Sequence, residues 1–124
     1  QEKADDIKLY ISTYGGSAHE MFGVYDVMNL CKQFCDIETI GIGKVMSAGT
    51  LLLAAGTKGK RKLGKNCQVM IHSVNEKSTR HIHSVSIKRT SMTKRQIQTL
   101  INRKVNVYLS SEEAIGKGLA DEVL

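Results

Sequence analysis

The chain has 124 residues, about the length of one domain, and its 41% hydrophobic and 24% charged residues are typical of an ordinary folded protein. The longest apolar run, residues 51–55, is far shorter than the ~20 residues of a membrane helix, so the sequence predicts no membrane span. The mostly polar first residues do not resemble a signal peptide. Because the chain begins at Gln1 rather than at a methionine, we expect it to be processed or incomplete.

Basic residues are concentrated in two regions, 58–65 and 77–104, and give a net charge of +6. A basic chain can bind nucleic acid. However, the chain has only two phenylalanines and four tyrosines to stack on bases, and it contains no recognisable nucleic-acid motif. We therefore expect no nucleic-acid partner. We interpret the first basic group as solvated loop charge or as contacts for an acidic partner; its members are Lys58, Lys60, Arg61, Lys62 and Lys65.

The three cysteines, Cys31, Cys35 and Cys67, do not form a metal-ligand pattern. A structural zinc site needs four ligands at characteristic spacing, and too few are present here. An odd number of cysteines also argues against a disulfide framework. We expect buried or half-buried thiols in a reducing compartment, with no metal ion and no other cofactor.

In chain order, segments with strand character alternate with segments of helix character. Residues 7–12 alternate apolar and polar side chains, which is typical of a strand. Residues 17–34 place apolar side chains at helical spacing after a capping pattern formed by Ser17 and Glu20. The expected strands are residues 7–12, 37–42, 67–72 and 121–124, and the expected helices are residues 17–34, 50–55, 90–104 and 110–117.

Glycines and polar residues separate these elements. The strand at residues 37–42 is expected to end at Gly41 and Gly43, and the basic residues 57–66 are expected to form a loop or a loose hairpin. Residues 73–89 are polar and have no clear period. The strand that precedes them is continuously apolar, which indicates a sheet covered on both faces. Alternating strands and helices predict an α/β layered fold.

Ser47 stands between a buried strand and the apolar helix that follows it. The amides in the first turn of a helix have no partner within the helix, and the helix dipole is positive there. A serine hydroxyl at this point lies beside ready-made donors to an oxyanion, each typically worth about 10²- to 10³-fold in rate. The alternative is that Ser47 only caps the helix, which is a common role of serine in this position.

His72 ends the next buried strand and is the candidate base for Ser47. Since neighbouring strands lie about 4.8 Å apart, two strand ends can bring a serine and a histidine within hydrogen-bonding reach. Gly15 and Gly16 follow the first strand, where paired glycines let the backbone approach a ligand closely and supply amides. A structural histidine and a simple tight turn are the alternatives, and spacing alone leaves them open.

Together, these segments resemble the proteolytic subunit of the Clp protease (ClpP), within the ClpP/crotonase fold. The most specific parts are Met-Ser-Ala-Gly at residues 46–49 and Val-Met-Ile-His at residues 69–72. The matching segments run in the family order and cover about two thirds of the chain; they are residues 9–12 with 15–17, 24–28, 42–56, 58–61 with 69–72, and 110–123.

The resemblance implies one ClpP-like protease domain over residues 1–124, without the family's N-terminal portion. It implies layered β-α-β units and a protruding handle at residues 73–104 that includes the helix expected at residues 90–104. It also implies Ser47 as nucleophile, His72 as general base, and an oxyanion hole formed by the amides of Gly16 and Ala48.

The implied activity is hydrolysis of unfolded polypeptides inside a chamber built by two heptameric rings stacked as a tetradecamer. An AAA+ Clp unfoldase would feed the chamber using ATP, and peptides would bind as added strands. The resemblance implies no cofactor. The implied location is the cytoplasm of a bacterium or of a phage-infected cell, or the matrix or stroma of an organelle.

The position of the triad aspartate, four residues before Ser110, holds Asn106. An asparagine can orient His72 and fix its tautomer, but it adds no negative charge to stabilise the imidazolium; in one serine protease this Asp-to-Asn change costs about 10⁴ in rate. Asp121 is the nearest other carboxylate, but it belongs to the motif of the family's C-terminal turn.

Three interpretations follow from the sequence. The first is an active serine peptidase with Asn106, or a residue missing from this sequence, as third member of the triad. The second is a non-catalytic ClpP-like subunit that fills a mixed ring, which Asn106 favours and the Ser47–His72 pair opposes. The third is another enzyme of the same fold; a crotonase-type acyl-CoA enzyme has no need of that pair, and a signal-peptide peptidase typically uses a lysine base.

Overall fold

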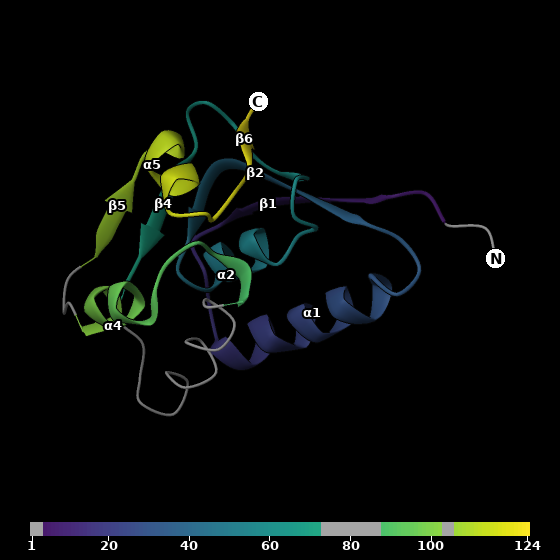
Figure 1. Ribbon diagram of the computed structural model, residues 1–124, viewed down its shortest axis with the longest axis horizontal. Helices are drawn as coiled ribbons and strands as arrows, with labels where there is room; N and C mark the ends of the chain where they lie inside the picture. Colours follow the sequence, from purple (N-terminus) through teal and green to yellow (C-terminus); the bar gives the residue numbers. More distant parts are fainter. Residues whose placement is uncertain (1–3, 73–87, 103–105) are drawn as a thin grey trace.

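The computed structural model describes residues 4–72, 88–102 and 106–124, with side chains described except at residues 100–102. Strands and helices alternate along most of the chain, which confirms the α/β class (Figure 1). Residues 73–87 and 103–104 of the expected handle lie outside the described residues, so the predicted domain and handle boundaries stay predictions. In chain order the elements are β1 (Ile7–Thr13), α1 (Ala18–Cys31), β2 (Ile37–Met46), α2 (Ala48–Ala54), β3 (Arg61–Leu63), β4 (Gln68–Ile71), α4 (Lys94–Asn102), β5 (Val107–Leu109), α5 (Ser111–Gly116) and β6 (Glu122–Val123).

The strands form one sheet in the order β5-β4-β2-β3-β6, and β1 also pairs with β2. All pairs are parallel except β4 with β5, which are antiparallel. The strand β2 is central, because it pairs with β1, β3 and β4. Among the described residues, no helix has the length and apolar character needed to cross a membrane.

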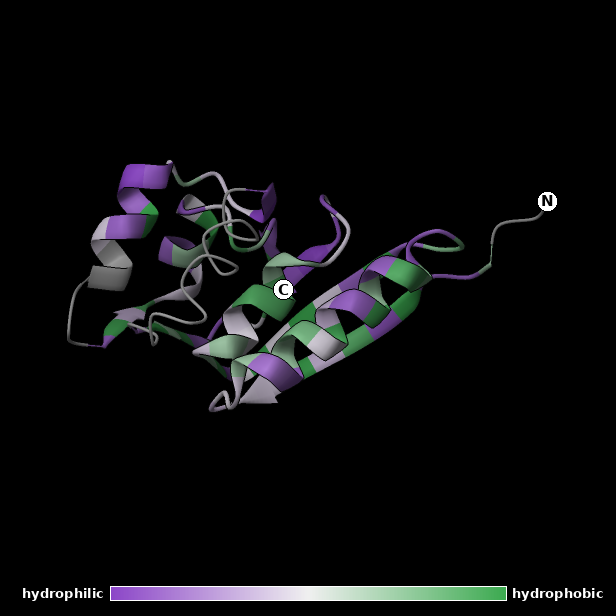
Figure 2. Cartoon of the chain, turned by 90° about the horizontal axis from the view of Figure 1, so that it is seen from below, coloured by the Kyte–Doolittle hydropathy of each residue, from purple (hydrophilic) through white to green (hydrophobic). Residues whose placement is uncertain are grey.

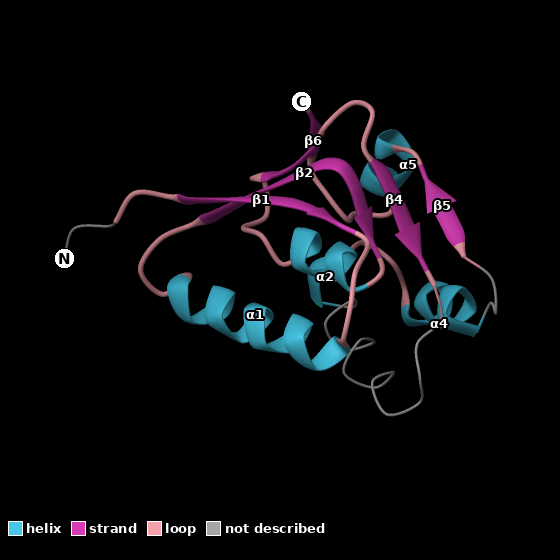
Figure 3. Ribbon diagram, turned by 180° about the vertical axis from the view of Figure 1, so that it is seen from behind, coloured by secondary structure: helices cyan, strands magenta, loops and turns pink. Residues whose placement is uncertain are grey.

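The strand β2 continues to Met46, so the prediction that it ends at Gly41 and Gly43 is wrong. Its earlier residues pair with β3, and its last three residues pair with β4. Gly43 has a φ of 72°, a conformation that glycine adopts readily, at the point where β2 leaves β3. Glycine bends the strand here instead of ending it, and Figure 3 shows the resulting curve of β2. The longer strand leads directly to Ser47.

Two short strands were not predicted. The strand β3 lies inside residues 57–66, so the expectation of a loop or hairpin is wrong for this part; β3 pairs in parallel with β2 and β6. The strand β5 pairs with β4 along one edge of the sheet. Each has only three residues, which is too few for a period of two to be recognised.

Two predicted helix starts are confirmed. Ser17 precedes α1, and its hydroxyl accepts a hydrogen bond from the His19 N–H at 3.2 Å. Ser110 precedes α5 and forms a complete capping box with Glu113, in which each residue's N–H donates to the other's side chain at 3.1 Å. The cap therefore locates a helix start more reliably than the apolar pattern locates its end, since α1 is shorter than predicted.

The helix α4 begins at Lys94, later than the predicted start at residue 90. A reciprocal cap sets this start: the Gln96 N–H donates to the Thr93 hydroxyl at 3.2 Å, and the Thr93 N–H donates to the Gln96 side chain at 2.8 Å. A threonine followed three residues later by glutamine is a capping-box signal in the sequence. The correct start of α4 could therefore have been predicted.

The helix α2 lies between two groups of buried side chains, and Figures 1 and 3 show it between α1 and the sheet. Leu53 and Ala54 belong to the group formed with the strands and α5, while Leu51 and Ala55 belong to the group formed with α1. Burial on both sides holds α2 firmly. The first group is Ile11, Val45, Leu53, Ala54, Leu63, Cys67, Val69, Leu109, Ala114, Leu119 and Ala120; the second is Met21, Tyr25, Met28, Ile37, Leu51, Ala55 and Ile97.

Arg61, expected to carry a solvated loop charge, is instead buried, with 4% of its surface exposed. Its guanidinium donates to both oxygens of Asp121, from Nε at 2.9 Å and from Nη2 at 2.8 Å. The Gly59 and Arg61 backbone N–H groups also donate to Asp121, at 2.7 Å and 3.0 Å. These hydrogen bonds, the Arg61 side chain's first, lower the pKa of Asp121. Asp121 precedes β6, so it lies away from β5 and does not replace the triad aspartate.

We expect Asp121→Asn to lower the free energy of unfolding at pH 7 by about 1.5 to 3 kcal/mol, the usual contribution of hydrogen bonds to a charged group. Folding lowers the pKa of this carboxyl, so its stabilisation is complete above the unfolded pKa, about 3.9, and is lost as pH falls through the folded pKa. The difference between parent and variant should therefore shrink between pH 7 and about pH 3 in urea unfolding. Asp26→Asn, at an exposed site on α1, is the control; a difference independent of pH would contradict the prediction.

Candidate active site

Ser47 lies at the turn between β2 and α2 in a conformation that is unusual for serine. Its φ is 56° and its ψ is −124°, and within the described ranges it is the only residue other than glycine with a positive φ. Such a conformation costs on the order of 1–3 kcal/mol and persists only where the surrounding structure enforces it. Strain of this kind clusters at functional sites, whereas a simple helix cap does not need it.

Hydrogen bonds from two elements hold the backbone of Ser47. Its N–H donates to the Met70 carbonyl of β4 at 2.8 Å, and its carbonyl accepts from the Thr50 hydroxyl of α2 at 2.7 Å. The Ser47 side chain, however, makes no capping hydrogen bond, although it occupies the N-cap position of α2. Capping therefore does not explain why serine is present here.

The end of β4 lies next to Ser47 and leads to His72. The strands β2 and β4 are parallel, and Met46 pairs with Met70, so both strands end at the same edge of the sheet. Ser47 is one residue beyond this pair and His72 is two residues beyond it; both are half-buried. The structure thus brings the two predicted residues to adjacent strand ends, about 4.8 Å apart from strand to strand.

Asn106 directly precedes β5, which pairs with β4 in antiparallel register. The last pair is Ile71 with Val107, and the same register continued by one residue would set Asn106 opposite His72. Opposite residues in such a ladder project to the same face, with Cβ atoms about 4.5–5.5 Å apart. Because β2, β4 and β5 are neighbours in that order, Ser47, His72 and Asn106 line up along one edge of the sheet.

Gly15 packs directly against Ser47. A Cβ atom on Gly15 would lie 2.6 Å from the Ser47 Cβ and 3.0 Å from the Met46 carbonyl oxygen, and the φ of Gly15 is 107°. A Cβ on the exposed Gly16 would meet nothing within 4 Å, so open space adjoins this residue. Ala48 follows Ser47 in the first turn of α2. The amides of Gly16 and Ala48, the predicted oxyanion donors, therefore belong to the two segments that meet at Ser47.

We expect Gly15→Ala to displace Ser47, because the added methyl group would occupy the space of the Ser47 Cβ. Overpacking of this kind typically costs about 1–3 kcal/mol of stability. We expect the peptidase activity that the family resemblance implies to fall more than about tenfold, because reacting groups would shift. Thermal unfolding and peptide hydrolysis measure the two effects. Gly23→Ala, at an open position on α1, should be neutral or slightly stabilising. Parent-like behaviour of Gly15→Ala would mean that the two segments do not meet closely.

Sequence reasoning missed two groups that hold Ser47. The Thr50 hydroxyl had a recognisable signal, since a threonine three residues after a serine at a helix start can bond back to that serine's carbonyl. The Met70 carbonyl had none, because any residue type supplies the same backbone acceptor. The contact depends on how β4 pairs with β2, which is a tertiary property.

The chemistry of the cysteines does not indicate a role in this site. All three are free thiols, and Cys35 and Cys67 are buried. Burial raises the pKa of Cys67, which keeps it protonated and unreactive. Within the described part of the chain, no group of three or more His, Cys, Asp or Glu residues could hold a metal ion.

Comparisons with known proteins agree with this architecture. The family model described as Clp protease matches residues 1–81, which is more than half of the chain. Among solved structures, the chain is similar to the crystal structure of the ClpP protease catalytic domain from Plasmodium falciparum, with 34% sequence identity and a TM-score of 0.83. The similarity covers 97% of this chain and 68% of that chain. The extent of both matches establishes that this chain belongs to the Clp protease family.

Proposed function

We propose that this chain is a serine endopeptidase subunit that hydrolyses unfolded polypeptides, with Ser47 as nucleophile and His72 as general base. The observation that supports this most directly is the strained backbone of Ser47. The Ser47 side chain does not cap α2, and the Ser47 N–H donates a hydrogen bond to the end of β4. Membership in the Clp protease family supports peptidase activity in general.

In the proposed mechanism, His72 accepts the proton of the Ser47 hydroxyl as its oxygen attacks the carbonyl carbon of the peptide bond. The carbonyl oxygen becomes an oxyanion, which accepts hydrogen bonds from the amides of Gly16 and Ala48. The imidazolium then donates its proton to the departing amine, and the C–N bond breaks. Water then attacks the ester carbon while His72 takes one of its protons, the bond from that carbon to Ser47 Oγ breaks, and His72 returns the proton to Oγ. Asn106 orients the imidazole throughout.

We also propose that the subunit assembles into two heptameric rings stacked as a tetradecamer and fed by an AAA+ Clp unfoldase. Membership in the Clp protease family supports assembly into rings with Clp ATPases in general. The helix α1 exposes Val24, Val27 and Leu30 by 43%, 58% and 58%, and Figure 2 looks onto this helix from the side away from the sheet. Such clustered apolar side chains are typical of contacts between subunits. The free cysteines fit a reducing compartment, such as a bacterial cytoplasm or an organelle matrix.

A non-catalytic ring subunit is the second candidate, and Asn106 is the observation that favours it. Without an aspartate, nothing in the predicted triad stabilises the imidazolium by charge. The conformation of Ser47 favours activity over this alternative, because a subunit without catalysis gains nothing from a strained serine.

Hydrolysis of a short fluorogenic peptide, which needs no unfoldase, distinguishes the two candidates. We expect the assembled parent to hydrolyse it. We expect Ser47→Ala to lose this activity while forming an assembly of the same native mass as the parent. Ser12→Ala, which removes an exposed hydroxyl from the neighbouring strand β1, should retain it. An assembled parent ring with no more activity than Ser47→Ala would support the non-catalytic role instead.

A further inference from the structure

Three successive carbonyl groups at the C-terminal end of α2 accept hydrogen bonds from side chains of other segments. The last carbonyls of a helix have no partner within the helix, so such donors fix its end. Two of the three donors are cations, which also stabilise the negative end of the helix dipole. The Thr39 hydroxyl donates to Leu53 at 2.8 Å, Arg61 Nη1 donates to Ala54 at 3.1 Å, and the Lys32 ammonium group donates to Ala55.

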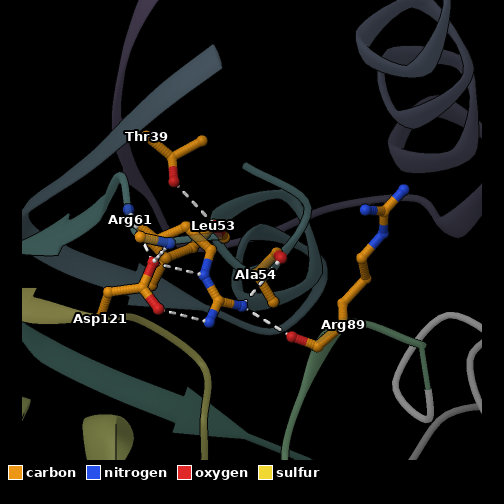
Figure 4. Close-up of polar contacts among 7 residues, drawn as sticks. Thr39, Leu53, Ala54, Arg61, Arg89 and Asp121 are labelled. Carbon is orange, nitrogen blue, oxygen red and sulfur yellow. Dashed lines mark hydrogen bonds and ion pairs between the residues drawn. The ribbon is translucent and has the colours of Figure 1, made fainter. Parts of the chain in front are cut away.

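Of these three donors, Arg61 also binds residues of two other segments, Asp121 and Arg89. Its side chain is 5% exposed, and Figure 4 shows its guanidinium between Asp121, Ala54 and the Arg89 backbone. While Nε and Nη2 bind Asp121, Nη1 donates both to the Ala54 carbonyl at 3.1 Å and to the Arg89 carbonyl at 2.6 Å. Only the planar guanidinium presents donors in enough directions to do this, which a lysine cannot match.

The Arg89 residue is itself anchored to α1. Its Nη2 donates to the Asn29 side chain at 2.8 Å, its Nε donates to the Tyr25 hydroxyl at 3.3 Å, and its guanidinium lies 5.5 Å from the centre of the Tyr25 ring. Arg89 precedes α4, the helix of the expected handle region. The segment that leads into α4 is therefore held from one side by α1 and from the other by Arg61.

We propose that Arg61 is a positioning residue for Ser47, and that it couples the position of α2 to the docking of Arg89. The helix α2 has seven residues and is about 10 Å long, so it moves as a rigid piece and carries a shift at Ala54 to Ser47 at its other end. The strained φ of Ser47 persists only while its surroundings are held in place. A displacement of about 1 Å at reacting groups can cost about 10²-fold in rate. This inference rests on the proposed role of Ser47 as nucleophile.

The variant Arg61→Lys tests the proposal, because it keeps a cation beside Asp121 and loses the shared contacts to Ala54 and Arg89. We expect kcat for a short peptide to fall about 10- to 100-fold with KM changed less than about twofold. We also expect faster amide hydrogen exchange at residues 47–55 and 88–91, measured at equal native mass. Lys62→Arg, a reverse exchange at the next residue, which forms ion pairs with Glu38 and Glu122, should match the parent in both measurements.

Arg89→Ala provides a second test that leaves the Arg61–Asp121 pair intact. Coupling predicts a lower kcat with an unchanged KM, and faster exchange at residues 47–55, although the Arg89 side chain donates hydrogen bonds to Tyr25 and Asn29 of α1. A folded Arg61→Lys and a folded Arg89→Ala with parent-like kcat and parent-like exchange in α2 would overturn the proposal. If the parent itself shows no hydrolysis, the proposed function fails, and hydrogen exchange alone still decides whether Arg61 and Arg89 hold α2.

Discussion

Replacing Asn106 with aspartate is expected to raise kcat for peptide hydrolysis by about 10²- to 10⁴-fold. Continued by one residue beyond the Ile71–Val107 pair, the register of β5 with β4 would set Asn106 opposite His72. In the proposed mechanism, a carboxylate there would stabilise the imidazolium that forms when His72 accepts the Ser47 proton. As an acceptor, the carboxylate would also hold the imidazole in the tautomer that takes this proton. Asn106 is exposed, so the new charge should cost little in desolvation.

Asn66→Asp is the matched control for this gain. It adds the same charge at an exposed position just before the start of β4, whereas His72 follows the end of that strand. It should therefore leave kcat within about twofold of the parent. Steady-state hydrolysis of a short peptide measures both variants at the same pH. If Asn106→Asp is no faster than Asn66→Asp, Asn106 does not face His72 and is not the third member of the triad.

Replacing His72 with alanine is expected to lower kcat by about 10³-fold or more, because the Ser47 hydroxyl then has no base to take its proton. We expect this substitution to lower the free energy of unfolding only slightly, since His72 lies just beyond the last residue of β4 and is only half-buried.

His19→Gln controls for the loss of a histidine elsewhere. His19 is exposed on the first turn of α1, and only its backbone N–H takes part in the cap with Ser17, so this variant should retain full activity. Single-turnover hydrolysis with excess enzyme separates the chemical step from product release. Full activity in His72→Ala would assign the base to another residue.

Much of the fold could be predicted from the sequence, because long apolar segments and helix caps are local signals. The strand β1 and the starts of α1 and α5 are examples. The course of β2 through its glycines could not be predicted, since it depends on tertiary packing: a Cβ atom on Gly41 would lie 2.7 Å from the Leu63 side chain. The three-residue strands β3 and β5 likewise form only because a neighbouring strand offers them hydrogen bonds.

The candidate site divides in the same way. The positions of Ser47 and His72 at strand ends were predictable, and the family resemblance singled them out. That these two strand ends are adjacent could not be predicted, because it requires β4 to pair with the last residues of β2, beyond the part of β2 that pairs with β3. Arg61 was missed because it stands in a run of lysines, and its carboxylate partner Asp121 is far away in sequence.

Covalent labelling at Ser47 tests the central claim most directly. The assembled parent is treated with a fluorophosphonate at pH 7.5, and the modified residue is located by mass spectrometry of its peptides. We predict a single adduct on Ser47, no adduct in Ser47→Ala, and much slower labelling in His72→Ala. A folded, assembled parent that forms no adduct, or forms one on another residue, would contradict the assignment of Ser47 as the nucleophile.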